Sequence, residues 1–588
     1  MCGIQGISTG ERRLVEEMNV ATAHRGPDDA GIAVDGEVGL GHNRLSILDL
    51  SPLGHQPMQT ADGAVQIVYN GEIYNFKALR GELEKAGDMF ISGSDTEVIM
   101  RGYAREGADF FKKLRGMWAL ALYDRRTHRI VLSRDPFGIK PLYYYLNKGV
   151  FAFSSELRGL RPVLSRYGAT DNALAHRLYF IFGYMPAPHT PFTEVSKLLP
   201  GEVAAFDLKT KTYSHEYTVL PYEESAPSKS LEEALDDTVR AHFVSDVPVG
   251  LFYSGGTDST LLLATARKLG FTPEAFFLRI PNRLDNDYAL AAARELGVTP
   301  TIFDFDSAAA YATLERTLAT LDEPFADSSY IPTEFLSLCA ARTHKVVLSG
   351  EGGDEFFGGY HRHDHLLTLT KGVPFIPPAA VALLSTRLRR LIEAKINRNP
   401  YASYLEFARL DEGSAPRGEA LEFLKERISP PYDNLGLSFD QKIYLPDDLL
   451  FKIDRAGMQH GLEGRVPFLD KQFFSTVRML PPEMRHGGIK GGKALLKNLL
   501  RAYLPDALVD RPKQGFSMPL VMAAQLPDAI FARAIEHAAA HPELVPLPHM
   551  LLSKLREHKN ARDAFREKHP QLAYVLLMWG GWQESYHI

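Results

Sequence analysis

The chain contains 588 residues, of which 45% are hydrophobic and 23% charged, with a formal net charge of −6. This length exceeds what one hydrophobic core supports, so we expect several domains. The lack of a basic surplus excludes a broad nucleic-acid-binding role, because such a protein needs positive charge to neutralise phosphates.

Cysteine content and hydropathy restrict the class further. The only cysteines are Cys2 and Cys339, so neither a disulfide framework nor a structural zinc cluster is expected. Residues 1–20 alternate apolar side chains with Glu and Arg and lack the apolar stretch of a signal peptide. The late apolar run 572–579 is too short to cross a bilayer. We therefore predict a cytoplasmic enzyme with no membrane or nucleic-acid partner.

The first third of the chain predicts short strands with helices between them. Strands are expected at 65–69, 118–123 and 130–133, and helices at 76–86 and 95–106. A predicted hairpin and then a polar stretch containing proline occupy 199–228 and indicate a domain junction. The chain is accordingly divided into domains 1–210 and 211–588.

The second domain begins with alternating strands and helices. Helices are predicted at 230–245, 260–269 and 287–296, and strands at 248–253, 275–280 and 344–348. This alternation is typical of a parallel sheet covered by helices. From about residue 366 onward the pattern is mainly helical.

Cys2 can become the first residue once the initiator methionine is removed. Its thiol would then lie beside an α-amine, whose pKa of about 7.7–8.0 allows it to act as a base at neutral pH. One residue would thus supply both nucleophile and proton acceptor, which is a cysteine version of the N-terminal threonine arrangement. A cysteine at position 2 is a weak signal on its own, and the motifs that follow it strengthen it.

Four further motifs supply what recognition of a free amino acid requires. The guanidinium of Arg44 can bind a carboxylate in bidentate fashion. Glu72 and Asp95 suit the α-ammonium, while the Asn70 amide and the Gly71 N–H would form an oxyanion hole. Taken singly, Asn-Gly after a strand is more often a turn, and Ser-Asp before a helix is more often an N-cap. The motifs lie at 24–29, 44–47, 70–75 and 93–97.

Together these motifs closely resemble the class II glutamine amidotransferase domain, an N-terminal-nucleophile hydrolase with an αββα sandwich fold. The family pattern of Met-Cys-Gly-Ile, Arg-Gly-Pro-Asp, Arg-Leu-Ser-Ile, Asn-Gly-Glu-Ile-Tyr-Asn and Ser-Asp-x-Glu is met in order. The resemblance implies that Cys2 is the nucleophile and that Asn70 and Gly71 assist it. It also implies that glutamine is bound by Arg44, Leu45, Ile47, Asn70, Gly71, Glu72 and Asp95.

A glycine-rich loop, Ser254-Gly255-Gly256-Thr257-Asp258-Ser259, follows a predicted buried strand and precedes a helix. Glycines at such a turn allow backbone N–H groups to approach phosphates, and the helix N-terminus favours an anion there. The loop contains no lysine, so it is not a Walker A motif. Asp258 would repel the phosphates unless a cation lay between them, which indicates Mg²⁺.

A second acidic loop, 349–355, follows another predicted strand. In a parallel sheet both loops emerge at the carboxyl ends of their strands, where ligands bind. The alternative is that both are ordinary connections with solvated acids, and two such loops in this order disfavour it. The segment 487–493 fits Gly-x4-Gly-Lys, but Ala494 replaces the required Ser or Thr and no strand precedes it, so it is not a P-loop.

The two loops resemble the PP-loop ATP pyrophosphatase domain of the glutamine-hydrolysing asparagine synthetases. The resemblance continues through 454–455, 463–470 and 511–516. It implies that Asp258 and Asp354 hold Mg²⁺-pyrophosphate, that Glu351 assists formation of an acyl-adenylate, and that Lys493 stabilises the developing charge. The residues that it places against ATP are Phe252, Ser254, Gly255, Gly256, Asp258, Ser259, Leu278, Ser349 and Gly350.

The resemblance implies a carbon–nitrogen ligase with glutamine as its nitrogen donor. Glutamine would be hydrolysed at Cys2, and the ammonia would pass through an internal tunnel to a carboxylate adenylated by Mg-ATP. The favoured carboxylate is aspartate, with asparagine as the product, and family members suggest a homodimer.

Two alternatives remain beside this interpretation. The family often carries Gly in the nucleotide strand where this chain has Leu278-Arg279, and a larger apolar residue at Gly464. Relatives on this scaffold amidate other carboxylates, including sugar acids and biosynthetic intermediates, although Cys2 argues against a β-lactam-forming relative. The other alternative is a non-catalytic scaffold protein that retains the fold, and the presence of Cys2, Asp258 and Asp354 argues against it.

Overall fold

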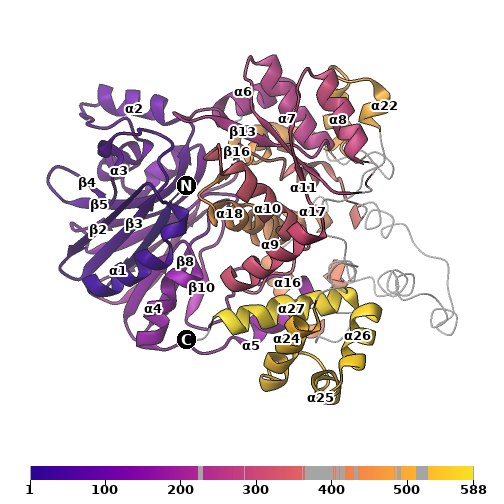
Figure 1. The fold of residues 1–588 in the computed structure, drawn as a ribbon. Helices are drawn as coiled ribbons and strands as arrows, with labels where there is room; N and C mark the ends of the chain where they lie inside the picture. Colours follow the sequence, from indigo (N-terminus) through magenta and orange to yellow (C-terminus); the bar gives the residue numbers. More distant parts are fainter. Residues whose placement is uncertain are drawn as a thin grey trace.

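A computed structural model describes most of the chain, and its two halves lie side by side (Figure 1). The described residues are 2–222, 229–281, 283, 285–360, 362–363, 401–402, 404–405, 410, 417–428, 435–481, 484–485, 492–510 and 527–586. Much of the predicted helical region after 366 and the motif 511–516 therefore lie outside the described residues. Within the described part, no helix combines the length and apolar character needed to span a membrane.

The first half contains two six-stranded sheets. In spatial order, one sheet consists of β10 (Val195–Lys197), β8 (Tyr143–Asn147), β9 (Val150–Ser154), β1 (Gly3–Ile7), β3 (Val38–Arg44) and β2 (Asp29–Asp35). The other consists of β12 (Thr212–Thr218), β11 (Glu202–Asp207), β7 (Arg129–Arg134), β6 (Gly116–Asp124), β5 (Val65–Ile73) and β4 (Met58–Gln59). All their strand pairs are antiparallel.

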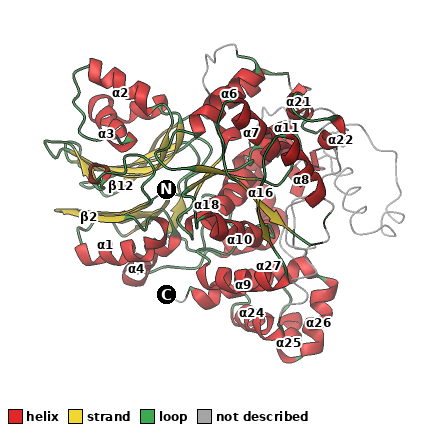
Figure 2. Cartoon of the chain, turned by 45° about the horizontal axis from the view of Figure 1, so that its top comes forward, coloured by secondary structure: helices red, strands yellow, loops and turns green. Residues whose placement is uncertain are grey.

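The two sheets pack face to face between two helical layers, as Figure 2 shows for β2 and β12. Buried side chains from both sheets form the central core, among them Ile4, Leu40, Val68 and Leu132. Helices α1 (Arg12–Ala21) and α4 (Leu157–Tyr167) cover one sheet, and α2 (Phe76–Lys85) and α3 (Asp95–Glu106) cover the other. This arrangement confirms the predicted αββα sandwich. The predicted domain end at 210 falls inside the β11–β12 hairpin.

The second half is built on a parallel five-stranded sheet, which confirms the predicted α/β class. Its order is β15 (Thr301–Asp304), β14 (Ala275–Arg279), β13 (Val249–Phe252), β16 (Val346–Leu348) and β17 (Glu463–Arg465). Helices α6 (Leu231–His242), α7 (Thr257–Lys268), α8 (Asp285–Glu295), α9 (Ser307–Thr320) and α10 (Tyr330–Ala340) accompany it. The predicted strands and helices of this region are all present, with boundaries shifted by a few residues.

The later part of the chain is mainly helical in its described residues, as predicted. Its helices are α11 (Gly353–Phe357), α16 (Arg417–Arg427), α17 (Leu435–Phe439), α18 (Leu450–Met458), α19 (Lys471–Met479), α21 (Ala494–Leu500), α22 (Asp506–Val509), α24 (Asp528–Ala540), α25 (His549–Glu557), α26 (Lys559–Lys568) and α27 (Pro570–Ser585). One strand interrupts them. β17 was not predicted, and it pairs in parallel with β16 at the edge of the sheet.

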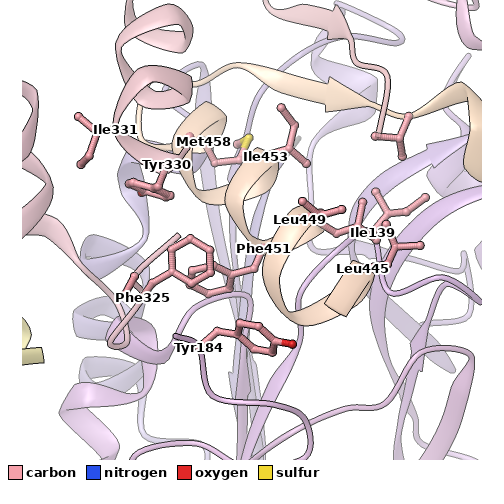
Figure 3. Packing of buried hydrophobic residues seen from close by; sticks show 14 of the residues in the cluster. Ile139, Tyr184, Phe325, Tyr330, Ile331, Leu445, Leu449, Phe451, Ile453 and Met458 are labelled. Carbon is pink, nitrogen blue, oxygen red and sulfur yellow. The ribbon is translucent and has the colours of Figure 1, made fainter. Parts of the chain in front are cut away.

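Helix α18 lies at the junction of the two halves, and Figure 3 shows the apolar packing around it. Phe451 contacts Phe325 with ring centroids 4.7 Å apart, and Leu449 and Ile139 belong to the same buried cluster. Since Ile139 comes from the first half and the others from the second, one continuous core joins the halves. Helix α5 (Ala173–Phe182) extends this junction, because the Tyr179 hydroxyl donates to the Val575 carbonyl of α27 at 2.7 Å.

Candidate active sites

Cys2 is held through its backbone just before β1. Its N–H donates to Asn70 Oδ1 at 2.8 Å, and its carbonyl accepts from Arg25 Nε at 3.0 Å. The side chain is buried, and burial raises the pKa of the Cys2 thiol. A buried neutral thiol needs a base to become a nucleophile, which fits the predicted use of an adjacent amine.

A pocket opens beside Cys2 and gathers nearly all the residues predicted to bind glutamine. It is lined by Cys2, Arg44, Leu45, Ile47, Leu48, Gly54, Gln56, Tyr69, Gly71, Glu72, Ser94, Asp95, Thr96 and Glu463. Asn70 is joined to the same group through its hydrogen bond to Cys2. The pocket therefore combines a thiol, cationic and anionic side chains, and an amide, although these residues come from distant parts of the chain.

The segment Asn70-Gly71-Glu72 does not form the turn that an Asn-Gly pair suggests, and it does not follow the strand. It lies inside β5, with Asn70 opposite Ala119 and Gly71 opposite Trp118 of β6. A Cβ at Gly71 would lie 2.1 Å from the Met117 carbonyl oxygen, so only glycine fits there. Within the described structure, Asn70 Nδ2 is buried without a hydrogen-bond partner, as expected of a donor reserved for a ligand.

The anionic side of the pocket contains Glu72 and Asp95. Asp95 Oδ2 accepts from the Tyr69 hydroxyl and the Ile73 N–H, both at 2.9 Å. Burial nevertheless raises the pKa of Asp95 to about 6. Burial also raises the pKa of Glu72 well above its ordinary value, and the nearby Arg465 opposes that effect. The helix-cap interpretation of this motif also holds, because Ser94 Oγ accepts from the Thr96 N–H at the start of α3.

Arg44 lies in the pocket wall, where its guanidinium is fixed by backbone carbonyls. Nη1 donates to Ser51 O at 3.0 Å, and Nη2 donates to Leu48 O at 3.2 Å and Asp49 O at 2.5 Å. A Cβ at Gly54 would lie 2.0 Å from Nη2, so the arginine occupies the space that a side chain there would need. Recognition of a substrate carboxylate by this cation stays a prediction.

Two residues of the second half contribute to the pocket, one by lining it and one by binding a residue that lines it, and the sequence analysis missed their role. Glu463 of β17 lines the pocket, and Arg465 Nη2 donates to Glu72 Oε2 at 2.9 Å. Burial would raise the pKa of Glu463, but positive groups around it, Arg465 and Lys140 among them, lower it to about 2. The available signal in the sequence was Glu463-Gly464-Arg465, in which two charged residues flank a glycine. Only the fold places these two charges at the pocket.

The second candidate site lies at the carboxyl ends of β13 and β16, which pair in parallel with Leu251 opposite Leu348. Asp258 lies in the first turn of α7 and Asp354 in the first turn of α11, the helices that follow these strands, and both contact the ammonium of Lys493. Lys493 Nζ hydrogen-bonds to Asp258 Oδ2 and lies 2.7 Å from Asp354 Oδ1. Lys493 is buried rather than on the surface, and burial would lower its pKa, but the two carboxylates outweigh this and raise it.

Glycines allow the two loops to touch. A Cβ at Gly353 would lie 2.4 Å from Asp258 Oδ1, and one at Gly350 would lie 3.0 Å from Asp258 Cβ. Gly255 has φ +70°, and a Cβ there would lie 2.3 Å from Ala289 Cβ of α8. The glycines thus bring the loops and α8 closer together than any other residue would permit.

The other predicted ATP contacts lie around the same loops. Ser254 Oγ accepts from the Gly256 N–H and lies 3.1 Å from Ser259 Oγ, which closes the first loop on itself. Phe252 and Leu278 are buried on the adjacent strands β13 and β14.

A lysine that the sequence analysis did not single out lies near the second loop. Ser349 Oγ hydrogen-bonds to Glu351, whose Oε1 lies 3.9 Å from Lys452 Nζ. Lys452 is buried on α18, 3.5 Å from Asp327, and its Nζ donates to Ser329 Oγ. A buried cation among carboxylates beside the candidate ATP site is suited to binding an anionic group.

The donor set of the second site fits a magnesium ion bound together with phosphates. Two carboxylates from the first turns of separate helices share one cationic partner, so they lie close enough to share a metal ion. Among the residues that the structure describes, no group of three or more His, Cys, Asp or Glu could hold a metal by itself. Mg²⁺ in nucleotide sites commonly takes one or two protein carboxylates and completes its shell with phosphate oxygens and water.

A cavity between the halves lies close to the Cys2 pocket. It is lined by Arg134, Gly138, Ile139, Pro141, Leu142, Tyr143, Lys197, Pro446, Asp447, Leu450, Phe451, Asp454 and Arg455. Asp454 accepts from Arg25 Nη1 at 2.8 Å, and Arg25 in turn donates to the Cys2 carbonyl. Two interactions therefore connect the backbone of Cys2 to the cavity wall.

Comparison with known proteins identifies two regions of the chain. A family model described as a glutamine amidotransferase domain matches residues 1–218, and one described as asparagine synthase matches residues 230–584. A glutamine-hydrolyzing asparagine synthetase 1 of Bacillus subtilis is 32% identical over 88% of this chain and 87% of its own length. A putative asparagine synthetase 2 of Methanocaldococcus jannaschii is 36% identical over 62% of this chain and 76% of its own. A putative asparagine synthetase of Mycobacterium bovis is 31% identical over 88% of this chain and 86% of its own.

Proposed function

Because the chain belongs to the family of glutamine-hydrolysing asparagine synthetases, we propose that it converts aspartate to asparagine with ammonia released from glutamine. Its enzyme class is that of the family, a carbon–nitrogen ligase with glutamine as nitrogen donor. The observation that carries the proposal is the pocket that gathers Cys2, Arg44, Gly71, Glu72 and Asp95. The ATP, magnesium and acceptor assignments belong to the proposal.

The first reaction takes place at Cys2. The thiol attacks the side-chain amide of glutamine, and the thiol proton passes to the α-amine that is exposed when Met1 is removed. Asn70 Nδ2 and the Gly71 N–H stabilise the oxyanion of the tetrahedral intermediate. The intermediate collapses to a γ-glutamyl thioester and releases ammonia, and water then hydrolyses the thioester to glutamate.

The pocket orients glutamine by charge. Arg44 binds its α-carboxylate, while Glu72 and Asp95 bind its α-ammonium. These groups are buried, so their interactions with the substrate are stronger than they would be in water. Holding both ends of the amino acid fixes its amide beside the thiol.

The second reaction activates the acceptor carboxylate. The backbone N–H groups of the loop 254–259 bind the phosphates of ATP at the start of α7. Mg²⁺ bound by Asp258 and Asp354 would neutralise phosphate charge. Lys493 supplies further positive charge, and Glu351 assists attack of the carboxylate on the α-phosphorus. Pyrophosphate leaves, and ammonia displaces AMP from the acyl-adenylate.

Ammonia must travel between the two sites without entering bulk water, where protonation would remove its nucleophilicity. In this proposal the cavity between the halves, with Ile139, Leu142, Leu450 and Phe451 in its wall, forms part of that route. These apolar side chains disfavour the ammonium ion relative to neutral ammonia, while Arg134, Lys197, Asp447, Asp454 and Arg455 add ionisable groups to the same wall.

Aspartate is the acceptor favoured by the family, and another carboxylate is the alternative. Gly464, one of the two departures from the family pattern, has a packing explanation. A Cβ there would lie 2.8 Å from Ile453 Cγ1 of α18. This glycine therefore follows from the close approach of β17 and α18 and does not argue for a different acceptor.

The test measures pyrophosphate release by the purified protein with Mg-ATP and glutamine, with and without aspartate, while asparagine is quantified. We expect pyrophosphate release that depends on aspartate and equals the asparagine formed. Glutamate release without aspartate-dependent pyrophosphate would contradict aspartate as acceptor, and a panel of other carboxylates would follow. Absence of both activities would contradict the enzymatic proposal.

A further inference from the structure

β17 connects the two candidate sites through one residue. It is the edge strand of the parallel sheet, and its Arg465 is fully buried. The Arg465 carbonyl accepts from the Ser349 N–H at 2.8 Å, at the start of the second acidic loop. Its side chain reaches the glutamine pocket of the other half. One residue thus contacts both the loop at the ATP site and the wall of the glutamine site.

The guanidinium of Arg465 is fixed by four hydrogen bonds. Nη2 donates to Glu72 Oε2 at 2.9 Å, and Nε donates to Glu463 Oε1 at 2.6 Å. Nη1 donates to the carbonyls of His242 at 2.9 Å and Val244 at 2.6 Å. A planar group held on all three nitrogens has one orientation available to it.

The hydrogen bond from Arg465 reaches only one of the two carboxylate oxygens of Glu72. Oε2 is bound by Arg465, whereas Oε1 is buried and, in the described structure, has no hydrogen-bond partner. Glu72 lines the pocket with Asp95 and Cys2. An orphaned carboxylate oxygen in such a pocket is suited to accept from the ammonium of a bound amino acid.

We propose that Arg465, supplied by the synthetase half, is a positioning residue of the glutamine pocket. It holds Glu72 by one oxygen so that the other meets the α-ammonium of glutamine. The inference rests on the proposed function, because it needs glutamine as the ligand of this pocket. The inference goes beyond the proposed function because it makes the glutamine pocket depend on both halves of the chain. The amidotransferase half alone does not contain the arginine that holds Glu72.

The charges in the pocket favour this role. Glu72, Asp95 and Glu463 bring three carboxylates to one buried pocket. Arg465 pairs with two of them, which reduces their mutual repulsion. Loss of the arginine would leave both carboxylates without this cation and would allow Glu72 to reorient or take up a proton.

The test compares glutaminase kinetics of the wild type and Arg465→Gln, measured as glutamate release, with ammonia-dependent amide formation measured in parallel. We expect the KM for glutamine to rise at least about tenfold in the variant, with a smaller change in kcat. Ammonia-dependent synthesis should be retained, because the Arg465 backbone that supports Ser349 is unchanged. In a Glu72→Gln background, Arg465→Gln should raise the KM for glutamine much less, because the carboxylate that Arg465 positions is already replaced.

The matched control is Arg115→Gln. Arg115 forms a comparable ion pair between the halves, donating to Asp470 at 2.8 Å, but its partners Asp470 and Asp237 do not line the pocket, whereas the partners Glu72 and Glu463 of Arg465 do. An equal rise in KM in this control, or an undiminished rise in the Glu72→Gln background, would overturn the proposal. If Arg465→Gln loses ammonia-dependent activity through misfolding, Arg465→Lys decides: a raised KM supports the role, and an unchanged one refutes it. Absence of glutamate release by the wild type would instead contradict the proposed function.

Discussion

Two distant side chains hold the backbone of Cys2, and this has a chemical consequence. Asn70 accepts from its N–H through Oδ1, so the amide is oriented with Nδ2 as its remaining donor. Arg25, which is fully buried, holds the carbonyl. The same Asn70 therefore positions the nucleophile and, in the proposed reaction, stabilises the oxyanion. Such shared use of one amide links nucleophile position to transition-state stabilisation.

Replacement of the nucleophile should separate the two reactions. In Cys2→Ala we expect glutamine-dependent amide formation to be abolished while ammonia-dependent formation continues, because the second site does not use the thiol. Both activities are measured as amide product with either nitrogen source. Loss of both in a variant with an unchanged thermal transition would contradict the assignment of separate sites.

The raised pKa of Asp95 predicts how glutamine binding depends on pH. The carboxylate must be ionised to bind an ammonium, and with a pKa of about 6 its ionised fraction falls about tenfold between pH 7 and pH 5. We therefore expect the KM for glutamine to rise as the pH falls through 6. Asp95→Asn should show a high KM at every pH without this inflection. A wild-type KM that stays constant from pH 7 to pH 5 would contradict the role of Asp95.

At the scale of elements, the sequence predicted three strands, one hairpin and two helices of the sandwich, and the alternating strands and helices that begin the parallel sheet. It was wrong about Asn70-Gly71-Glu72, which lies inside β5 although Asn and Gly are poor strand formers. The cause is tertiary, since the Met117 carbonyl leaves no space for a Cβ at position 71. β17 was missed for a similar reason, because a three-residue strand is defined by pairing with β16 and not by its own propensity.

The contact between the two glycine-rich loops should be sensitive to a single methyl group. In Gly353→Ala the new Cβ would meet Asp258 Oδ1 at 2.4 Å, so the carboxylate must move. We expect pyrophosphate release to fall at least about tenfold while glutaminase activity is retained. Gly81→Ala in α2 is the control, because nothing lies within 4 Å of its Cβ and alanine stabilises a helix by about 0.5–1 kcal/mol. Unchanged pyrophosphate release in Gly353→Ala would contradict a role for the Asp258 position.

At the scale of the molecule, buried ion pairs join the halves beside the apolar core of α18. Arg25 lies 2.7 Å from Glu156 and 2.8 Å from Asp454, and Arg455 lies 2.7 Å from the same Glu156. Arg25, Asp454 and Arg455 lie within motifs named from the sequence, whereas Glu156 lies in none of them. The pairing of Arg25 with Asp454, 429 positions later, depends on how the two halves dock, which no local pattern encodes.

Breaking this network should destabilise the whole protein. Asp454→Asn removes one charge beside Arg25, and an incompletely paired buried charge costs about 3–5 kcal/mol. We expect a clearly lower thermal midpoint, measured by circular dichroism. Asp510→Asn is the control, because its pair with Arg501 lies at the surface and should leave the midpoint unchanged. Equal midpoints for Asp454→Asn and wild type would show that the network does not hold the halves together.

The packing of α27 against α5 has a consequence for how the protein is made on the ribosome. Trp579 Nε1 of α27 donates to His176 Nδ1 of α5, a residue 403 positions earlier in the chain. At roughly 5–20 residues per second, α27 is synthesised roughly 20 to 80 s after α5. Throughout that interval His176 and Phe180 of α5 lack their contacts with Trp579. The incomplete chain therefore lacks part of the packing that buries α5 in the finished protein, and apolar surface exposed in this way makes a nascent chain prone to aggregation.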